Sequence, residues 1–228
     1  MPQRSKRYRE AKALVQADKV YEPEEAVSLI KRMPQTKFDA AVEVHIRLGI
    51  DVKQANQLVR GSTILPHGLG KQKRIAVFCG EAKIKEAKAA GATLVGGEEL
   101  IKEIQSSGRC DFDIALATPD MMKALAPIAK ILGQKGLMPN PKTETITMEV
   151  GKAVTSLQRG KVNFKGDDSG NVHQMIGKVS FEASKILENF NSFIEAVRRA
   201  RPAAAKGSYF VKVTLATSMS PGVSVKVS

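Results

Sequence analysis

The hydrophobic pattern of this chain changes twice along its length, and this change limits which folds are open to it. Between residues 74 and 117, short continuous apolar runs alternate with amphipathic segments that begin with acidic residues and end at glycine. Continuous apolar runs are typical of strands buried on both faces, and the segments between them are typical of the crossover helices of a parallel sheet. The middle of the chain is therefore expected to form a parallel sheet covered by helices.

The expected elements of the middle region can be placed individually. Strands are predicted at residues 74–79, 93–95 and 112–117, and helices at 81–90 and 98–107. A third helix is expected to open at Thr118-Pro119-Asp120 and to run to residue 133, kinked or shortened by Pro127.

The two ends of the chain have a different pattern. In residues 38–48, Val42, Val44, Ile46 and Leu48 alternate with Glu43, His45 and Arg47, which indicates a strand with one exposed face. A helix is expected over residues 24–31, with Pro23 at its start, and another over 182–199. Residues 161–165 and 171–176 are predicted to form a hairpin around the turn 166–170, and residues 208–228 two strands joined by the loop 217–222. We expect both ends to share one antiparallel sheet, with the middle inserted between them.

The balance of charge points to a polyanionic partner. The chain carries 36 Lys and Arg against 23 Asp and Glu, a net charge of +13. The flanks carry most of this excess, and nucleic acid is the first candidate. The first residues lack the apolar run of a signal peptide, there are two cysteines, and no stretch is long and apolar enough for a membrane span, so a cytoplasmic protein without a membrane partner is expected.

Motifs that would indicate catalysis are incomplete. Gly68-Leu69-Gly70-Lys71 fails the phosphate-loop pattern at Leu65 and Gln72, and the three histidines lack metal-ligand spacing. His45 and His173 are therefore expected to be ordinary residues of a sheet face, and no catalytic residue, metal or cofactor is predicted. Two rival classes remain, an enzyme acting on a phosphorylated metabolite and a DNA-binding regulator, but neither has its sequence signature.

Two loops suggest binding surfaces. Residues 132–143 form a basic loop stiffened by Pro139 and Pro141, and residues 217–222 place hydroxyl side chains around Met219. Hydroxyl groups and a single apolar side chain suit close approach to ribose and phosphate. Phe38, after Lys37 at the start of a strand, is expected to keep an accessible ring.

These segments also carry a resemblance. The runs KFDAAVEVHIRLGID, VRGSTILPHGLGK, ILGQKGLMPNPKT, GNVHQMIGKVSF and KGSYFVKVTLATSMSPGV resemble the bacterial L1 family of large-subunit ribosomal proteins. The resemblance implies a discontinuous two-layer α/β sandwich with a mainly antiparallel sheet, from residues 1–67 and 160–228, and an inserted three-layer Rossmann-like domain from 68–159. Crossing points that would act as hinges are expected at Pro66, Gly68, Gly70 and Gly160.

The resemblance also implies a function and a site. It implies a monomeric, non-enzymatic protein of the ribosome that binds large-subunit ribosomal RNA in the mobile stalk, assists release of exit-site tRNA, and represses translation by binding the leader of its own messenger. The RNA-binding residues that it implies are Lys37, Phe38, Glu43, Lys165, Gly177, Lys178, Thr217, Ser218, Met219, Ser220 and Pro221. Ser220 stands where the family commonly has Gly, and Lys165 where it commonly has Arg. At these two positions the sequence departs from the family pattern on which the implied contacts are based.

Overall fold

The computed structural model describes residues 4–16, 19–70 and 73–227, and the chain forms two compact units. The first unit comprises residues 1–70 and 162–228, and the second comprises residues 71–161. The predicted combination of an antiparallel sheet from the chain ends and a parallel sheet from the middle is confirmed.

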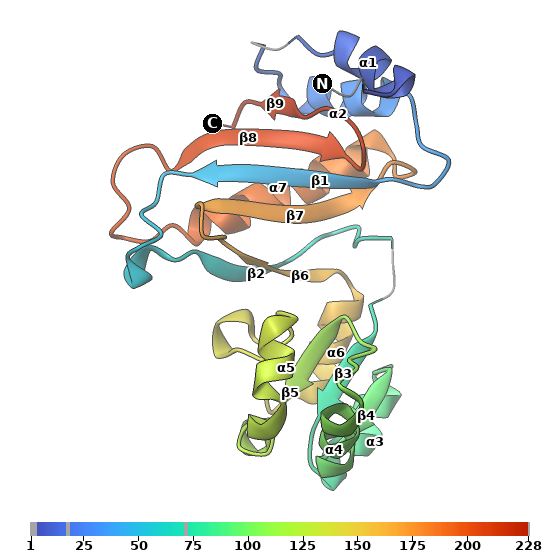
Figure 1. The fold of residues 1–228 in the computed structure, drawn as a ribbon, viewed down its shortest axis with the longest axis vertical. Coiled ribbons are helices and arrows are strands. Elements are labelled where there is room, and N and C mark those ends of the chain that lie inside the picture. The colour runs from blue at the N-terminus through green and yellow to red at the C-terminus, as the bar shows by residue number, and fades with distance from the viewer. Residues whose placement is uncertain (1–3, 17–18, 71–72, 228) are drawn as a thin grey trace. The chain divides into compact units, whose positions relative to one another are not determined.

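A four-stranded sheet lies at the centre of the first unit (Figure 1). Its strands, in spatial order, are β7 (Asn171–Lys178), β1 (Ala41–Leu48), β8 (Phe210–Thr217) and β9 (Val223–Val225), and each pairing is antiparallel. The alternation seen in β1 matches its burial, because Val42, Val44 and Ile46 are buried in the core. Glu43, His45 and Arg47 therefore lie on the opposite face of the sheet.

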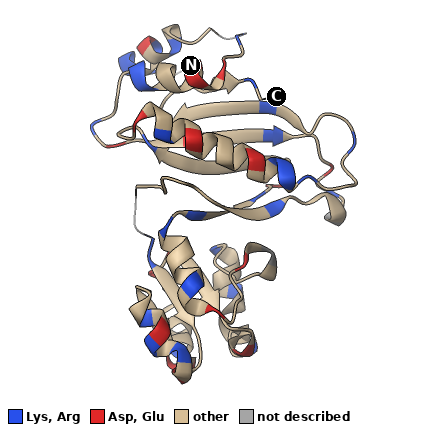
Figure 2. Cartoon of the chain, turned by 180° about the vertical axis from the view of Figure 1, so that it is seen from behind, with Lys and Arg blue, Asp and Glu red and all other residues tan. Residues whose placement is uncertain are grey.

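Among the residues that the structure describes, helices cover one face of this sheet (Figures 1 and 2). In Figure 2, which views the molecule from the side opposite to Figure 1, α7 (Ala183–Arg199) crosses in front of the sheet, and its Phe190 and Phe193 are fully buried in the core. α2 (Pro23–Arg32) contacts β8, β9 and α7, and begins at Pro23, whose missing N–H needs no partner in a first turn. The face carrying Glu43, His45 and Arg47 is called the open face below. A short helix that the sequence did not suggest, α1 (Lys6–Ala13), buries Ala11 against the same core and is capped by Ser5.

The prediction that residues 161–165 and 171–176 pair with each other as a hairpin is wrong. β6 (Lys161–Lys165) pairs with β2 (Arg60–Ile64) in a separate two-stranded sheet, after the short 3-10 helix Ala55–Gln57. Only an isolated bridge, Gly166 to Val172, joins the two sides of the turn, whereas β7 continues along β1. The turn fails to become a hairpin because the Gly166 N–H donates to Val59 O and directs β6 toward β2.

The second unit has three layers. Its parallel sheet has the order β4-β3-β5, with β3 (Ile75–Phe78), β4 (Leu94–Gly96) and β5 (Ile114–Ala117). One face carries α3 (Glu81–Ala89) and α6 (Val150–Gln158), and the other carries α4 (Glu98–Ser107) and α5 (Ala129–Gln134). α6 was not predicted from the sequence.

The predicted helix at residues 118–133 is split into three pieces. Pro119–Met122 and Ala126–Ile128 are short 3-10 helices, and only Ala129–Gln134 is α-helical. Pro127 has no N–H to donate and its ring obstructs the preceding turn, so a continuous α-helix cannot pass it. A further 3-10 turn is Pro141–Thr143. Within the described parts of the chain, no helix is long and apolar enough to cross a membrane.

Candidate nucleic-acid interface

Three segments far apart in the sequence meet at one end of the four-stranded sheet. Ala41, the first residue of β1, pairs with Lys178 at the end of β7, and its carbonyl accepts from the Ser218 N–H after β8. We call this place the Met219 corner, defined by Lys37, Phe38, Lys178, Ser218 and Met219. The register of the sheet thus brings five of the predicted RNA-binding residues to one end of it, and Figure 1 shows the start of β1 beside the ends of β7 and β8.

Met219 is held outward by a tight turn. The Ser220 N–H donates to Thr217 O at 3.0 Å, and Met219 has a left-handed φ of +70°. A non-glycine residue is uncommon there and costs conformational energy. The Met219 side chain is nevertheless 69% exposed, so an apolar group is presented on a fixed backbone.

Ser220 closes this turn rather than projecting from it. Its Oγ accepts from the Thr217 N–H at 2.9 Å and donates to Pro221 O at 3.0 Å. Both functions of the hydroxyl are satisfied within the turn, so the side chain that replaces the family's glycine folds back into the protein. Thr217 and Pro221 are buried, and their contribution is to shape the loop.

Hydrogen bonds of the neighbouring residues hold the loop that carries the exposed Phe38. Asp39 accepts from the N–H and the hydroxyl of Ser180, at 3.1 and 2.9 Å, and Lys178 Nζ donates to Asp39 O. Thr36 Oγ1 donates to Phe38 O at 2.6 Å. The Phe38 ring, 58% exposed, therefore stands on a fixed loop, as the sequence predicted. An exposed ring of this kind suits stacking against an unpaired base.

Sequence reasoning missed the helix beside this corner. Arg7 and Ala11 of α1 line a small hollow together with residues 34–36 and the turn 217–220. The segment KRYREAKA is strongly basic, and Ser5 at its N-cap was the signal that a helix begins there. α1 therefore adds cationic side chains next to Met219.

The remaining predicted residues lie elsewhere. Gly177 is buried, and a Cβ there would lie 3.2 Å from the Phe181 ring, so its place is beneath the surface. Glu43 lies on the open face. Lys165 is exposed at the end of β6, beside the turn that precedes β7, which is the opposite end of the sheet from the Met219 corner. The structure thus does not bring Lys165 together with the corner.

Two histidines meet on the open face. His45 and His173 are directly paired between β1 and β7, with their Nδ1 atoms 2.9 Å apart. Burial lowers the pKa of His45, and the neighbouring His173 lowers it further, while Glu43 opposes this shift. Asp167 Oδ2 lies 3.4 Å from His173 Nε2. Hydrogen bonds from Asn171 lower the pKa of the Asp167 carboxyl to about 2, although burial opposes them.

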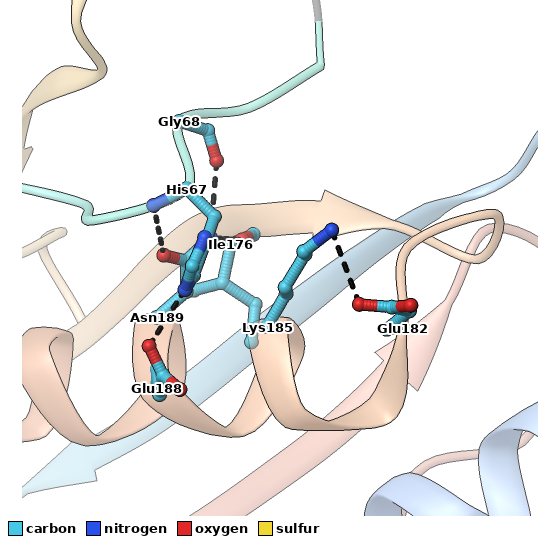
Figure 3. A network of polar contacts seen from close by, with 7 residues as sticks. All are labelled: His67, Gly68, Ile176, Glu182, Lys185, Glu188 and Asn189. Carbon is cyan, nitrogen blue, oxygen red and sulfur yellow. Dashed lines mark hydrogen bonds and ion pairs between the residues drawn. The ribbon is translucent and has the colours of Figure 1, made fainter.

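The first crossing segment is bonded to the first unit (Figure 3). Asn189 of α7, fully buried, accepts from the His67 N–H at 3.0 Å and donates to Gly68 O and Ile176 O at 3.0 and 2.7 Å. His67 Nε2 lies 2.6 Å from Glu188 Oε2. The buried amide thus holds β7, α7 and the crossing segment together.

The predicted hinge residues fall on both sides of the unit boundary. Pro66, Gly68 and Gly70 belong to the first unit and Gly160 to the second. A Cβ on Gly70, whose φ is +70°, would lie 2.9 Å from the Phe181 ring. Gly160 also has a left-handed φ, +104°, which glycine adopts without strain.

The comparison with protein families decides the identity of this chain. Residues 29–221 match the model of the ribosomal protein L1p/L10e family. The chain belongs to this family. This confirms the resemblance seen in the sequence, and it makes the chain a ribosome-associated structural protein of the large subunit that binds ribosomal RNA. The L1 family is one of RNA-binding structural proteins rather than of enzymes, and α1 lies outside the matched residues.

Proposed function

We propose that this L1-family protein grips ribosomal RNA chiefly with the Met219 corner. The observation that carries the proposal is that three chain segments are hydrogen-bonded together there so that Phe38 and Met219, both well exposed, project from fixed backbone. Lys37 and the basic helix α1 would attract the phosphate backbone, and the two apolar side chains would recognise the irregular shape of the RNA. Gly177, Thr217, Ser220 and Pro221 would keep the corner in shape.

The test is replacement of Met219 by Ala, with Met148→Ala as the matched control. Met148 is an exposed methionine of the second unit. We expect Met219→Ala to weaken binding to large-subunit ribosomal RNA about tenfold, or about 1.4 kcal/mol, and to leave binding to competitor tRNA unchanged. Equal loss of both affinities, or no loss of either, would remove the role assigned to Met219.

We further propose that the same corner binds the leader of the protein's own messenger and thereby represses translation. What supports this is the nature of the surface, because the Ser218 hydroxyl, the exposed Phe38 ring and the exposed Met219 side chain suit recognition of RNA shape rather than of a long base sequence. Two RNAs with a similar local fold would then compete. Large-subunit ribosomal RNA should displace a leader fragment from the protein, and Met219→Ala should weaken both complexes alike.

For the second unit we propose contact with exit-site tRNA and assistance in its release. The loop 132–143 supports this, because it carries Lys135 at its surface and its backbone is held in place. The Asn140 N–H donates to Thr145 Oγ1 at 2.7 Å, and Leu137 N–H donates to Leu132 O at 2.8 Å. Lys135→Ala should slow tRNA release from ribosomes while binding of ribosomal RNA stays unchanged. We propose no bond-making step for either unit.

A further inference from the structure

His45 and His173 form a pair that their sequence positions do not reveal. They are 128 residues apart in the chain, yet they occupy directly opposed positions of β1 and β7. The centroids of their rings are 5.1 Å apart, and the ring planes are inclined by 62°. Their side chains remain 35% and 53% exposed, so an ion from solvent can reach them.

Each ring has a carboxylate near its Nε2 atom, which is the nitrogen turned away from the other ring. Glu43 Oε2 lies 3.7 Å from His45 Nε2, and Asp167 Oδ2 lies 3.4 Å from His173 Nε2. Asp167 is itself fixed by the N–H groups of Ser169 and Asn171, at 2.9 and 2.7 Å. The Asp167 carboxylate favours the His173 tautomer with its hydrogen on Nε2, which leaves the lone pair on Nδ1, whereas Glu43 is too far from His45 Nε2 for a hydrogen bond and only adds negative charge beside that ring.

The two Nδ1 atoms face each other at 2.9 Å, where in the neutral pair one ring donates its Nδ1–H to the Nδ1 lone pair of the other. A divalent metal ion can replace this hydrogen bond once the donating ring carries its hydrogen on Nε2 instead, because both Nδ1 lone pairs are then free to bind the ion. Two nitrogen ligands at right angles, each roughly 2.0–2.1 Å from an ion, lie about 2.9 Å apart, so the spacing suits adjacent positions of a square-planar or octahedral ion. Carboxylates near Nε2 are the usual second layer of a histidine metal site.

We propose that His45 and His173 chelate a divalent first-row transition metal ion, with Cu²⁺ and Ni²⁺ as the best fit, and that Asp167 orients the His173 ring while Glu43 adds negative charge beside the site. In the described part of the chain, no group of three or more His, Cys, Asp and Glu side chains is arranged to hold a metal ion. The pair therefore supplies two ligands and water supplies the others, which makes a readily exchanging site. Arg47 and Lys212, paired with each other one step further along the open face, add positive charge nearby and moderate the affinity.

The experiment is calorimetric titration of the full chain with CuCl₂ and with NiCl₂ at neutral pH. We expect one equivalent of either ion to bind to the wild-type protein. His45→Gln and His173→Gln should each weaken binding about tenfold or more, and Asp167→Asn roughly tenfold, because a lost orienting partner commonly costs this much. His67→Gln is the control, since His67 contacts Glu188 elsewhere in the first unit, and it should bind the metal like the wild type.

Electron paramagnetic resonance of the Cu²⁺ complex identifies the ligands without relying on a variant that must fold. Hyperfine coupling to two imidazole nitrogens is the expected result, and a large excess of Mg²⁺ should not displace the copper. Coupling to a single imidazole, equal affinity of the wild type and His45→Gln, or no stoichiometric binding would each overturn the proposal and leave a proton as the sole occupant between the rings.

Discussion

Single residues at the Met219 corner are available to a partner because their neighbours are fully hydrogen-bonded. Asp39 holds the loop before β1, and Ser220 closes the turn after β8. Phe38 and Met219 take no part in these side-chain bonds and are exposed. The exposure of Phe38 and Met219 therefore depends on Asp39 and Ser220 as much as on the two side chains themselves.

Lys37 is the residue whose electrostatic role can be measured separately. It is exposed beside Phe38, so we expect it to neutralise one phosphate. Lys37→Ala should then lower the slope of log affinity against log salt concentration by about 0.7–0.9, the contribution of one counterion. Lys130→Ala, an exposed lysine of the second unit, should leave the slope unchanged. An unaltered slope for Lys37→Ala would mean that this ammonium does not contact the backbone of the RNA.

Asn189 shows what a buried polar residue contributes to stability. Replacement by Leu would leave the His67 N–H and the carbonyls of Gly68 and Ile176 without their partner. We expect a loss of about 2–4 kcal/mol in the free energy of unfolding, measured by urea denaturation. Asn191→Leu, at an exposed position of the same helix, should change it by less than about 0.5 kcal/mol. Similar effects of the two substitutions would contradict the structural role of the amide.

At the scale of elements, the phenol of Tyr209 joins the end of α7 to the start of β8. Its hydroxyl donates to Val197 O at 3.1 Å, and burial raises its pKa to about 12, although Arg201 opposes the shift. A raised pKa means that the contribution of this group to stability is complete below pH of about 10 and is lost as the pH rises toward 12.

Tyr209→Phe tests this connection. Near pH 8 the free energy of unfolding of the variant should be about 1 kcal/mol lower than that of the wild type, because the hydrogen bond to Val197 is lost. Between about pH 10 and 12 the difference should shrink, since only the wild type loses the Tyr209 contribution there. Urea midpoints at several pH values give the comparison, and a difference that stays constant with pH would show that the hydroxyl is not buried in this way.

Most elements could be predicted from local pattern, and the exceptions have physical causes. The alternation of Val42, Val44 and Ile46 predicted β1, and the acidic starts and glycine ends predicted α3 and α4. The pairing of β6 was missed because partners in a sheet are chosen by long-range packing. Phe164 of β6 lies edge-on to Phe193 of α7, and a Cβ on Gly61 of β2 would lie 2.7 Å from the Phe164 ring.

The candidate site was predictable only in part. Exposed Phe38 and Met219 follow from their sequence surroundings, namely a lysine before a strand and a loop of small hydroxyl residues. Which loop residues are buried depends on the turn, so Thr217 and Pro221 could not be separated from Met219 beforehand. The meeting of His45 with His173 depends on the register of β1 and β7, which no local pattern specifies.

At the scale of the whole molecule, two kinds of hydrophobic pattern correspond to two units with different sheets. The alternating pattern of both chain ends gives a sheet with one open face, and the continuous apolar runs of the middle give a sheet covered on both faces. Only the first kind leaves a sheet surface free for a partner. The central claim is therefore that ribosomal RNA contacts the first unit, at the Met219 corner.

Hydrogen exchange of the full chain, free and bound to large-subunit ribosomal RNA, tests this claim most directly. RNA bound at the Met219 corner should slow exchange in residues 36–41 and 217–220, while residues 73–159 exchange as in the free protein. Slower exchange confined to residues 73–159, with no change at 36–41 and 217–220, would contradict the assignment of the RNA-binding surface to the first unit.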